Sequence, residues 1–194
     1  MPEVKNKIKY GIKNCYYAVA TIAEDGSATF GTPVALPGAV SLTLDPEGDS
    51  SPFYADNRVY YEGVANNGYT GSLELALVPD SFRKDVLGEI EDASHILVED
   101  ANEEPKNIAL LFQFEGDKKA TRHVLYNVKP GRTSNSGNTK TENVEPETES
   151  IPLTARPIYV SSLDKYFVKA KTTEDTASAT YTGWFETVYV PTTL

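Results

Sequence analysis

Cysteine is almost absent from this chain, since Cys15 is the only one among 194 residues. One cysteine cannot form an intrachain disulfide, which excludes the small secreted folds that depend on such cross-links. There are only two histidines, His95 and His123, so a dedicated zinc site is not expected. A chain of this length can bury a hydrophobic core without either device. We therefore expect a single domain over residues 1–194 that needs no metal ion and no cofactor.

Positive charge is also scarce: 18 lysines and arginines stand against 28 aspartates and glutamates, a net charge of −10. Proteins that hold nucleic acid through its phosphates need clustered basic residues, so that class is excluded. No apolar run reaches the roughly 18 to 20 residues of a membrane-spanning helix. Residues 1–13 contain four lysines but no apolar stretch, so we do not expect a secretory signal there.

Motifs for catalysis are missing as well. No glycine-rich loop ends in Lys-Ser or Lys-Thr, as a phosphate-binding loop would. Cys15 lies in an alternating run over 14–19, which favours buried packing over a role as nucleophile, and both histidines are interpreted as surface or interface residues. The alternating acids Asp45, Glu47 and Asp49 lack the rest of a calcium-binding loop, so a solvated loop is the simpler interpretation. The chain is therefore not expected to be an enzyme.

Tyrosine, in contrast, is abundant, with 12 copies against 7 phenylalanines and 1 tryptophan. Apolar and polar residues alternate, as in strands with one buried face, over 40–44, 71–78 and 108–115. Turn-forming residues separate strand-like runs at 24–27, 66–68 and 115–118. These patterns predict a mainly β fold with largely antiparallel sheets.

Two tyrosine pairs, Tyr16-Tyr17 and Tyr60-Tyr61, put aromatic side chains on both faces of a predicted strand. A domain of this size cannot easily cover both faces of a sheet by itself, so a second sheet or a partner surface is implied. Tyrosine is common at protein interfaces because it offers a large rigid area and a hydroxyl group. The alternative is that tyrosine only fills half-buried strand positions; we favour assembly.

One short helix is expected over 80–88, flanking the sheet. Asp80 or Ser81 fits the N-cap, and Gly88 fits the C-terminal stop. Its apolar face, with Phe82 and Val86, should lie on the sheet, because so short a helix is marginal alone. The remaining expected segments are an N-terminal arm 1–9, a long acidic loop 45–58, a polar loop 132–149 and a C-terminal arm 190–194.

The order and spacing of several segments resemble a known family. The segments are 9–14 (KYGIKN), 36–39 (LPGA), 53–57 (FYADN), 68–74 (GYTGSLE), 79–88 (PDSFRKDVLG), 109–119 (ALLFQFEGDKK) and 122–127 (RHVLYN). Together they are similar to the major tail proteins, or tail tube proteins, of phages with long non-contractile tails. The resemblance runs from about residue 9 to about residue 160.

The resemblance implies a structural protein of the virion, a β-sandwich or barrel of two packed sheets with one flanking helix. In such a family six copies form a ring, and rings stack into a tube around a tape-measure protein that later gives way to DNA. One sheet of each subunit joins its neighbours in an inner barrel, while long loops and arms clamp adjacent rings. Further implied partners are the tail terminator and distal tail proteins. The implied location is the virion tail, assembled in the host cytoplasm, with DNA only in transit and no membrane.

Two sets of candidate site residues follow. The polar sides of the predicted strands give the candidate lumen-facing residues Thr43, Ser72, Glu74, Gln113 and Glu115; their alternative role is an ordinary solvent-exposed face. The segment 45–58 combines aromatics with charge and gives the candidate inter-ring contacts Phe53, Tyr54 and Arg58. Six copies at −10 each would give a ring charge of −60, which would keep DNA from sticking to the passage.

Two other functions remain open on the sequence alone. The first is a β-sandwich module of a virion or cell surface that binds a receptor or a carbohydrate. The second is an enzyme with a buried carboxylate pair, although nothing singles out a pair among the 28 acids. A self-assembling subunit differs from both because it should form rings or tubes when purified.

Overall fold

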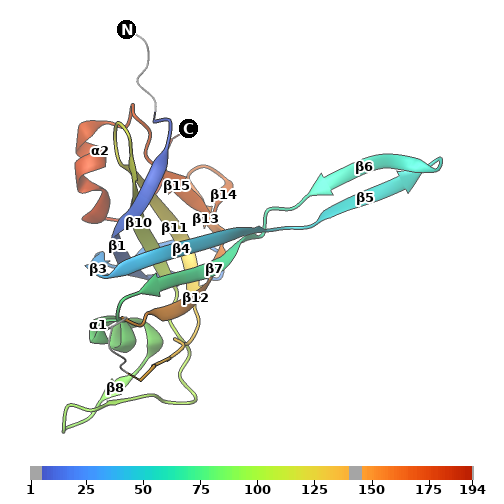
Figure 1. Ribbon diagram of the computed structural model, residues 1–194. Coiled ribbons are helices and arrows are strands. Elements are labelled where there is room, and N and C mark those ends of the chain that lie inside the picture. Colours follow the sequence, from blue (N-terminus) through green and yellow to red (C-terminus); the bar gives the residue numbers. More distant parts are fainter. Residues whose placement is uncertain (1–5, 140–145, 194) are drawn as a thin grey trace.

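The computed structural model describes residues 6–139 and 146–193, in which strands dominate (Figure 1). Nine strands form one sheet: β1 (Lys9–Ile22), β2 (Ala28–Phe30), β3 (Val34–Ala35), β4 (Ala39–Glu47), β7 (Gly68–Leu75), β10 (Ile108–Gly116), β11 (Thr121–Pro130), β12 (Glu149–Arg156) and β15 (Lys169–Lys171). Their order is β2-β1-β10-β11-β12-β7-β4, with β3 beside β1 and β15 beside β11. Every neighbouring pair is antiparallel, which confirms the predicted mainly β, antiparallel architecture.

Two-stranded ribbons complete the β structure of the described residues. They are β5 (Ser50–Ala55) with β6 (Arg58–Val64), β8 (Ile90–Glu91) with β9 (Leu97–Val98), and β13 (Ile158–Val160) with β14 (Lys165–Phe167). Figure 1 shows the β5–β6 ribbon projecting far from the body as a continuation of β4 and β7.

Strand burial follows the predicted period of two wherever only one face of a strand is covered. In β7, Leu73 and Leu75 are buried, whereas Ser72 and Glu74 are only partly covered. In β10 the alternation fails, because residues 108–113 are all buried. Both faces of β10 are therefore covered, a central position that the alternating pattern of this strand did not indicate.

The main core lies on one face of β10, where Ile108, Leu110 and Phe112 meet buried side chains from β1, β7, β11 and β12. Such contact between distant strands requires the sheet to curl, and β4 at one end comes close to β1 near the other. The two packed layers expected from the sequence are thus two parts of one curled sheet.

A second core covers the opposite face of β10. Here Ala109 and Leu111 meet Trp184 and Val188, which come from the C-terminal part of the chain. Tyr16 of β1 also lies on this side and stacks on Phe185, with ring centroids 4.8 Å apart. The chain therefore covers both faces around Tyr16-Tyr17 by itself, so this tyrosine pair does not require a partner.

The expected helix over 80–88 is present in a modified form. One α-helical turn, α1 (Asp80–Phe82), continues as a π-helical turn, η1 (Arg83–Leu87), and Gly88 ends it at φ +80° as predicted. Phe82 and Val86 are fully buried against the main core, which confirms the predicted face. The predicted N-cap is wrong: Pro79 occupies that position, and Asp80 lies inside the first turn, where its charge favours the helix dipole.

A second helical segment was not predicted and corrects the expectation of one helix. It consists of α2 (Ser178–Thr182) followed by the 3-10 turn η2 (Gly183–Phe185). Its residues have modest helix propensity, so packing holds it in place. Trp184 is buried, and its ring N–H donates to the carbonyl oxygen of His123 at 3.3 Å.

Two of the three predicted hairpins are confirmed and one is wrong. The turns at 24–27 and 115–118 join β1 to β2 and β10 to β11. The turn at 66–68 does not join paired strands, because β6 pairs with β5 and β7 pairs with β4 and β12. The segment 45–58 is not a loop: it holds the end of β4, all of β5 and the first residue of β6. Both faces of β5 and β6 are exposed to solvent, so the segment is polar, contains proline and lacks the alternation from which a strand is predicted.

The other three predicted irregular segments lie only partly in the described residues. Of the C-terminal arm 190–194, residue 194 lies outside them, and Val190 packs against the second core. Of the N-terminal arm 1–9, residues 1–5 lie outside them and Lys9 opens β1. The Asn6 side-chain oxygen accepts hydrogen bonds from the backbone N–H groups of Lys118 and Lys119, both at 3.0 Å. Of the polar segment 132–149, residues 140–145 lie outside the described part, and a single bridge joins Ser134 to Ser150.

Candidate assembly surfaces

The arm, defined as β5, β6 and the turn between them (50–64), exposes an unusual amount of aromatic surface. Phe53, Tyr54, Tyr60 and Tyr61 are each between 61% and 67% exposed. The strands pair only with each other among the described residues, so the arm has no core of its own. An isolated ribbon of this kind is at best marginally stable in water. Its exposed rings therefore suit contact with another surface.

The tip of the arm is a two-residue turn. Asp56 and Asn57 both have positive φ, 51° and 56°, as a type I′ turn requires. Aspartate and asparagine tolerate this left-handed region better than other residues with a side chain. The sequence Asp-Asn between two strand-forming runs was thus a turn signal, and it was missed because no glycine accompanies it.

A β-bulge in β6 determines which side chains of the arm share a face. Phe53 pairs with Tyr61, but Tyr54 pairs with Val59, so Tyr60 is the extra residue. Because directly opposed residues share a face, one face carries Pro52, Tyr54, Val59 and Glu62. The other face carries Phe53, Ala55, Arg58 and Tyr61. Glu62 and Arg58 therefore lie on opposite faces of the ribbon.

The root of the arm is held tightly to the body. Arg156 of β12 donates to a carboxylate oxygen of Glu47 at 2.5 Å and to the carbonyl oxygen of Asn67 at 3.0 Å. Gly68 has φ +111°, and a Cβ there would lie 1.9 Å from the carbonyl oxygen of Ala155. Only glycine permits this close approach, so the direction of the arm is set where it leaves the sheet.

The structure brings the three candidate inter-ring residues together on the arm: Phe53 and Arg58 on one face and Tyr54 on the other. Sequence reasoning did not include Tyr60 and Tyr61 in this set, although both are equally exposed. Their position directly after the Asp-Asn turn would have placed them on the same ribbon had the turn been recognised.

The candidate lumen-facing residues separate into two groups. Thr43 pairs with Ser72, and Glu74 lies beside them, accepting a hydrogen bond from the Ser41 hydroxyl at 2.7 Å. These side chains lie on the outer face of β4 and β7, opposite the buried leucines. Together they form a polar surface, to which β12 adds Ser150 and Thr154, with Pro152 between them.

The other two candidates lie on β10, away from that surface. Gln113 is only 5% exposed, and its side-chain oxygen accepts a hydrogen bond from Arg122 Nε at 3.2 Å. Glu115 forms an ion pair with Lys13 of β1. The structure thus does not place Gln113 and Glu115 with Thr43, Ser72 and Glu74, and it covers Gln113 within the subunit.

A groove opens at the partly covered end of the main core, near the root of the arm. We call it the basic groove; it has a volume of about 380 Å³. Its apolar lining includes Leu42, Leu44, Tyr69, Phe112 and Phe114. Lys9 and Lys169 stand at its rim, with Nζ atoms 4.6 Å and 4.2 Å from the ring centres of Phe114 and Tyr69. A set of cations over aromatic rings is notable in so acidic a chain.

His123 forms part of the groove wall. Its ring stacks on Phe112 at 5.1 Å and meets the Phe114 ring edge to face at 5.5 Å. Burial lowers the pKa of His123 to about 4, and the positive charges of Lys171, Lys9 and Lys169 act in the same direction. The imidazole is therefore neutral at pH 7.

Stability should depend on the titration of His123. The unfolded chain binds a proton at this residue below about pH 6.5, whereas the folded chain does so only near pH 4. Stability should therefore fall by about 2 kcal/mol as the pH drops from 7 to 5. The substitution His123→Gln should flatten that slope in urea unfolding followed by circular dichroism.

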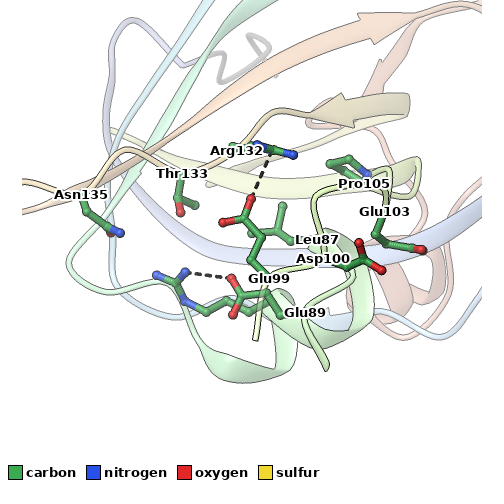
Figure 2. A pocket seen from close by; sticks show the side chains of 10 residues that line it. Leu87, Glu89, Glu99, Asp100, Glu103, Pro105, Arg132, Thr133 and Asn135 are labelled. Atoms are coloured by element: carbon green, nitrogen blue, oxygen red, sulfur yellow. Dashed lines mark hydrogen bonds and ion pairs between the residues drawn. The ribbon is translucent and has the colours of Figure 1, made fainter. Parts of the chain in front are cut away.

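A second pocket, lined by charged residues, lies beside α1 and η1 (Figure 2). It holds only about 70 Å³, space for a few water molecules. Figure 2 shows Glu99 beneath Arg132, with the pair 3.2 Å apart. Arg83 pairs with Glu89 at 3.2 Å and with Glu149 at 2.9 Å. These ion pairs hold chain segments together, and the pocket is too small for an organic substrate.

Groups suited to catalysis or metal binding do not converge in the described part of the chain. There, no three side chains of histidine, cysteine, aspartate or glutamate are placed to share a metal ion. Burial raises the pKa of the Cys15 thiol to about 12, which makes it a poor nucleophile. Within residues 6–139 and 146–193, no helix has the length and hydropathy needed to span a membrane.

Comparison with known proteins gives structural neighbours only. No protein-family model matches the chain, and no curated protein matches it. A chain of the anti-feeding prophage cap, the tube terminating cap, is similar with a TM-score of 0.41 and 11% identity, covering 86% of this chain and 93% of that one. A chain of the anti-feeding prophage baseplate is similar with a TM-score of 0.40 and 10% identity, covering 90% and 98%.

Proposed function

We propose that the chain is a structural subunit of a phage tail tube, which assembles with copies of itself into stacked, six-membered rings. The observation that carries this proposal is the arm, a ribbon with aromatic residues exposed on both faces. A monomer gains nothing from such a projection, whereas an assembling subunit can bury it against a neighbour.

An unpaired sheet edge supports the same proposal. Among the described strands, β4 is hydrogen-bonded only to β7, so its second edge has no strand partner. Free edges invite uncontrolled aggregation unless they are covered, and a closed ring covers them. A neighbouring subunit could pair with this edge.

The polar surface around Thr43, Ser72 and Glu74 is the proposed lining of the passage. Its uncharged hydroxyls and its carboxylate offer DNA no cation to bind, in keeping with the chain's net charge of −10. Gln113 and Glu115 are set aside from this role because they lie on another strand and pair within the subunit. The tape-measure, tail terminator and distal tail proteins are the proposed partners of the tube.

The direct test is the particle itself. Purified protein, concentrated stepwise, should give hollow tubes or six-fold rings in negative-stain electron micrographs and a rising weight-average mass in sedimentation velocity. A protein that remains monomeric at all concentrations, salts and temperatures would contradict the proposal. If that monomer bound selectively to a glycan or cell array, it would instead support the receptor- or carbohydrate-binding alternative.

A further inference from the structure

The basic groove lacks a partner for its cations. Among the described residues, no carboxylate forms an ion pair with Lys9, Lys169 or Lys171, although acids outnumber bases in the chain. Lys9 and Lys169 line the groove, while Lys171 lies beside His123 across β11 and β15 and lines, with Lys9, a pocket that adjoins the groove at Phe114 and His123. Such a surface suits a ligand with an aromatic group and nearby negative charge.

One face of the arm has this chemistry. Tyr54 and Val59 supply apolar area, Glu62 supplies a carboxylate on the same face, and Asp56 adds another at the tip. The only cation of the ribbon, Arg58, lies on the opposite face. We propose that the Tyr54–Val59–Glu62 face of the arm of one copy docks in the basic groove of a second copy. This proposal rests on the proposed function, and it names the acceptor site for the arm.

The arm cannot reach the groove of its own chain. Leu44 and Tyr69 line the groove and lie beside the root of the arm, where Glu47 pairs with Gly68. The tip lies nine residues further along the ribbon, about 30 Å away at the rise of a β-strand. Figure 1 shows the ribbon leading away from the body. The arm face and the basic groove of one subunit therefore lie too far apart to contact each other.

This separation allows a head-to-tail assembly. A donor surface on one copy and a different acceptor surface on the next can join head to tail, in a contact that closes into a ring or continues as a stack. Every subunit would offer one arm and one groove. Two copies joined in this way leave one arm and one groove unused, so growth continues beyond a dimer.

The test uses charge exchange between the two surfaces. The arm variant carries Asp56→Asn, which keeps the turn, and Glu62→Lys; the groove variant carries Lys9→Glu, Lys169→Glu and Lys171→Glu. Each alone should associate at least about 100-fold more weakly than the unmodified chain in sedimentation velocity, because like charges would face each other. A control with Lys106→Glu, Lys129→Glu and Lys165→Glu, outside both surfaces, should assemble normally.

Two recombinations make the result specific. Mixing the arm variant with the groove variant restores opposite charge at both contacts between unlike chains, so the mixture should form tubes of alternating subunits although neither variant does so alone. A chain that carries both sets of changes should regain tubes, since its basic arm then faces an acidic groove. Circular dichroism of each variant verifies that the body is folded, and the arm variant cannot disturb the core because the arm lies outside it.

The outcomes separate the two proposals. If the unmodified chain never associates, the tube subunit and the docking site both fail. If it forms tubes and the arm and groove variants form them equally well, the docking site is wrong while the tube subunit stands. Loss of assembly in both variants without recovery in the mixture and without rescue in the combined chain would also overturn the docking site.

Discussion

Replacing residues 48–67 by an Asn-Gly turn should abolish self-association and leave the body of the protein folded. The replacement joins β4 directly to β7 at the pair Glu47 and Gly68, where the strands are already in register. Asn-Gly is a favoured sequence for the tight turn needed there. No residue of the arm belongs to either hydrophobic core. Stability should therefore change by less than about 1 kcal/mol, whereas assembly loses its main projecting contact.

The measurements for this deletion are electron microscopy and sedimentation velocity for assembly, and thermal melting for the fold. The matched control shortens the other exposed ribbon, replacing residues 92–95 between β8 and β9 by Asn-Gly. That control should assemble as the unmodified chain does. Normal tubes from the arm deletion would show that the arm is not an assembly element.

The largest effect on stability should come from Phe82→Ala. The Phe82 ring is 1% exposed and meets the Tyr17 ring edge to face, with centroids 5.1 Å apart. Tyr17 in turn donates a hydrogen bond from its hydroxyl to Asp85 at 2.9 Å, so this contact fastens α1 and η1 to the sheet. Removing such a ring costs about 3–5 kcal/mol, a large share of the roughly 5–15 kcal/mol that holds a domain together.

Urea or thermal unfolding gives the measurement, with a melting temperature expected to fall by about 6–20 °C. Leu77→Ala is the matched control, because Leu77 lies nearby in sequence and is 68% exposed. It should change the free energy of unfolding by less than about 0.5 kcal/mol. Equal effects from the two substitutions would mean that the helical segment does not pack as described.

The sequence was informative wherever local patterns and burial agreed. Alternation in β7 placed Leu73 and Leu75 in the core, and glycine-containing turns identified two hairpins correctly. Phe82, Val86 and Gly88 located the helical segment because its amphipathic face and its left-handed end are both local signals. These features need no knowledge of distant contacts.

The rest depended on contacts between distant residues. The second core forms because Trp184 and Val188 return to β10, and nothing in a window around 178–185 predicts that. Gln113 alternates like an exposed residue, yet Arg122 covers it from the neighbouring strand. Only the first strand of the arm, β5, falls in the predicted loop 45–58, because a strand exposed on both sides shows no hydrophobic alternation. The groove joins residues from six strands and has no signature in any one segment.

The lack of a core within the arm has a kinetic consequence. A two-stranded ribbon in water is only marginally stable, so each free subunit spends part of its time with an unpaired arm. Docking must then offset the entropic cost of ordering the ribbon, and in an isolated pair of subunits only one contact is available to offset it. A subunit joining a growing assembly gains several contacts at once. We therefore expect a slow nucleation step followed by rapid elongation, so that tubes start at a template and seldom form spontaneously in dilute solution.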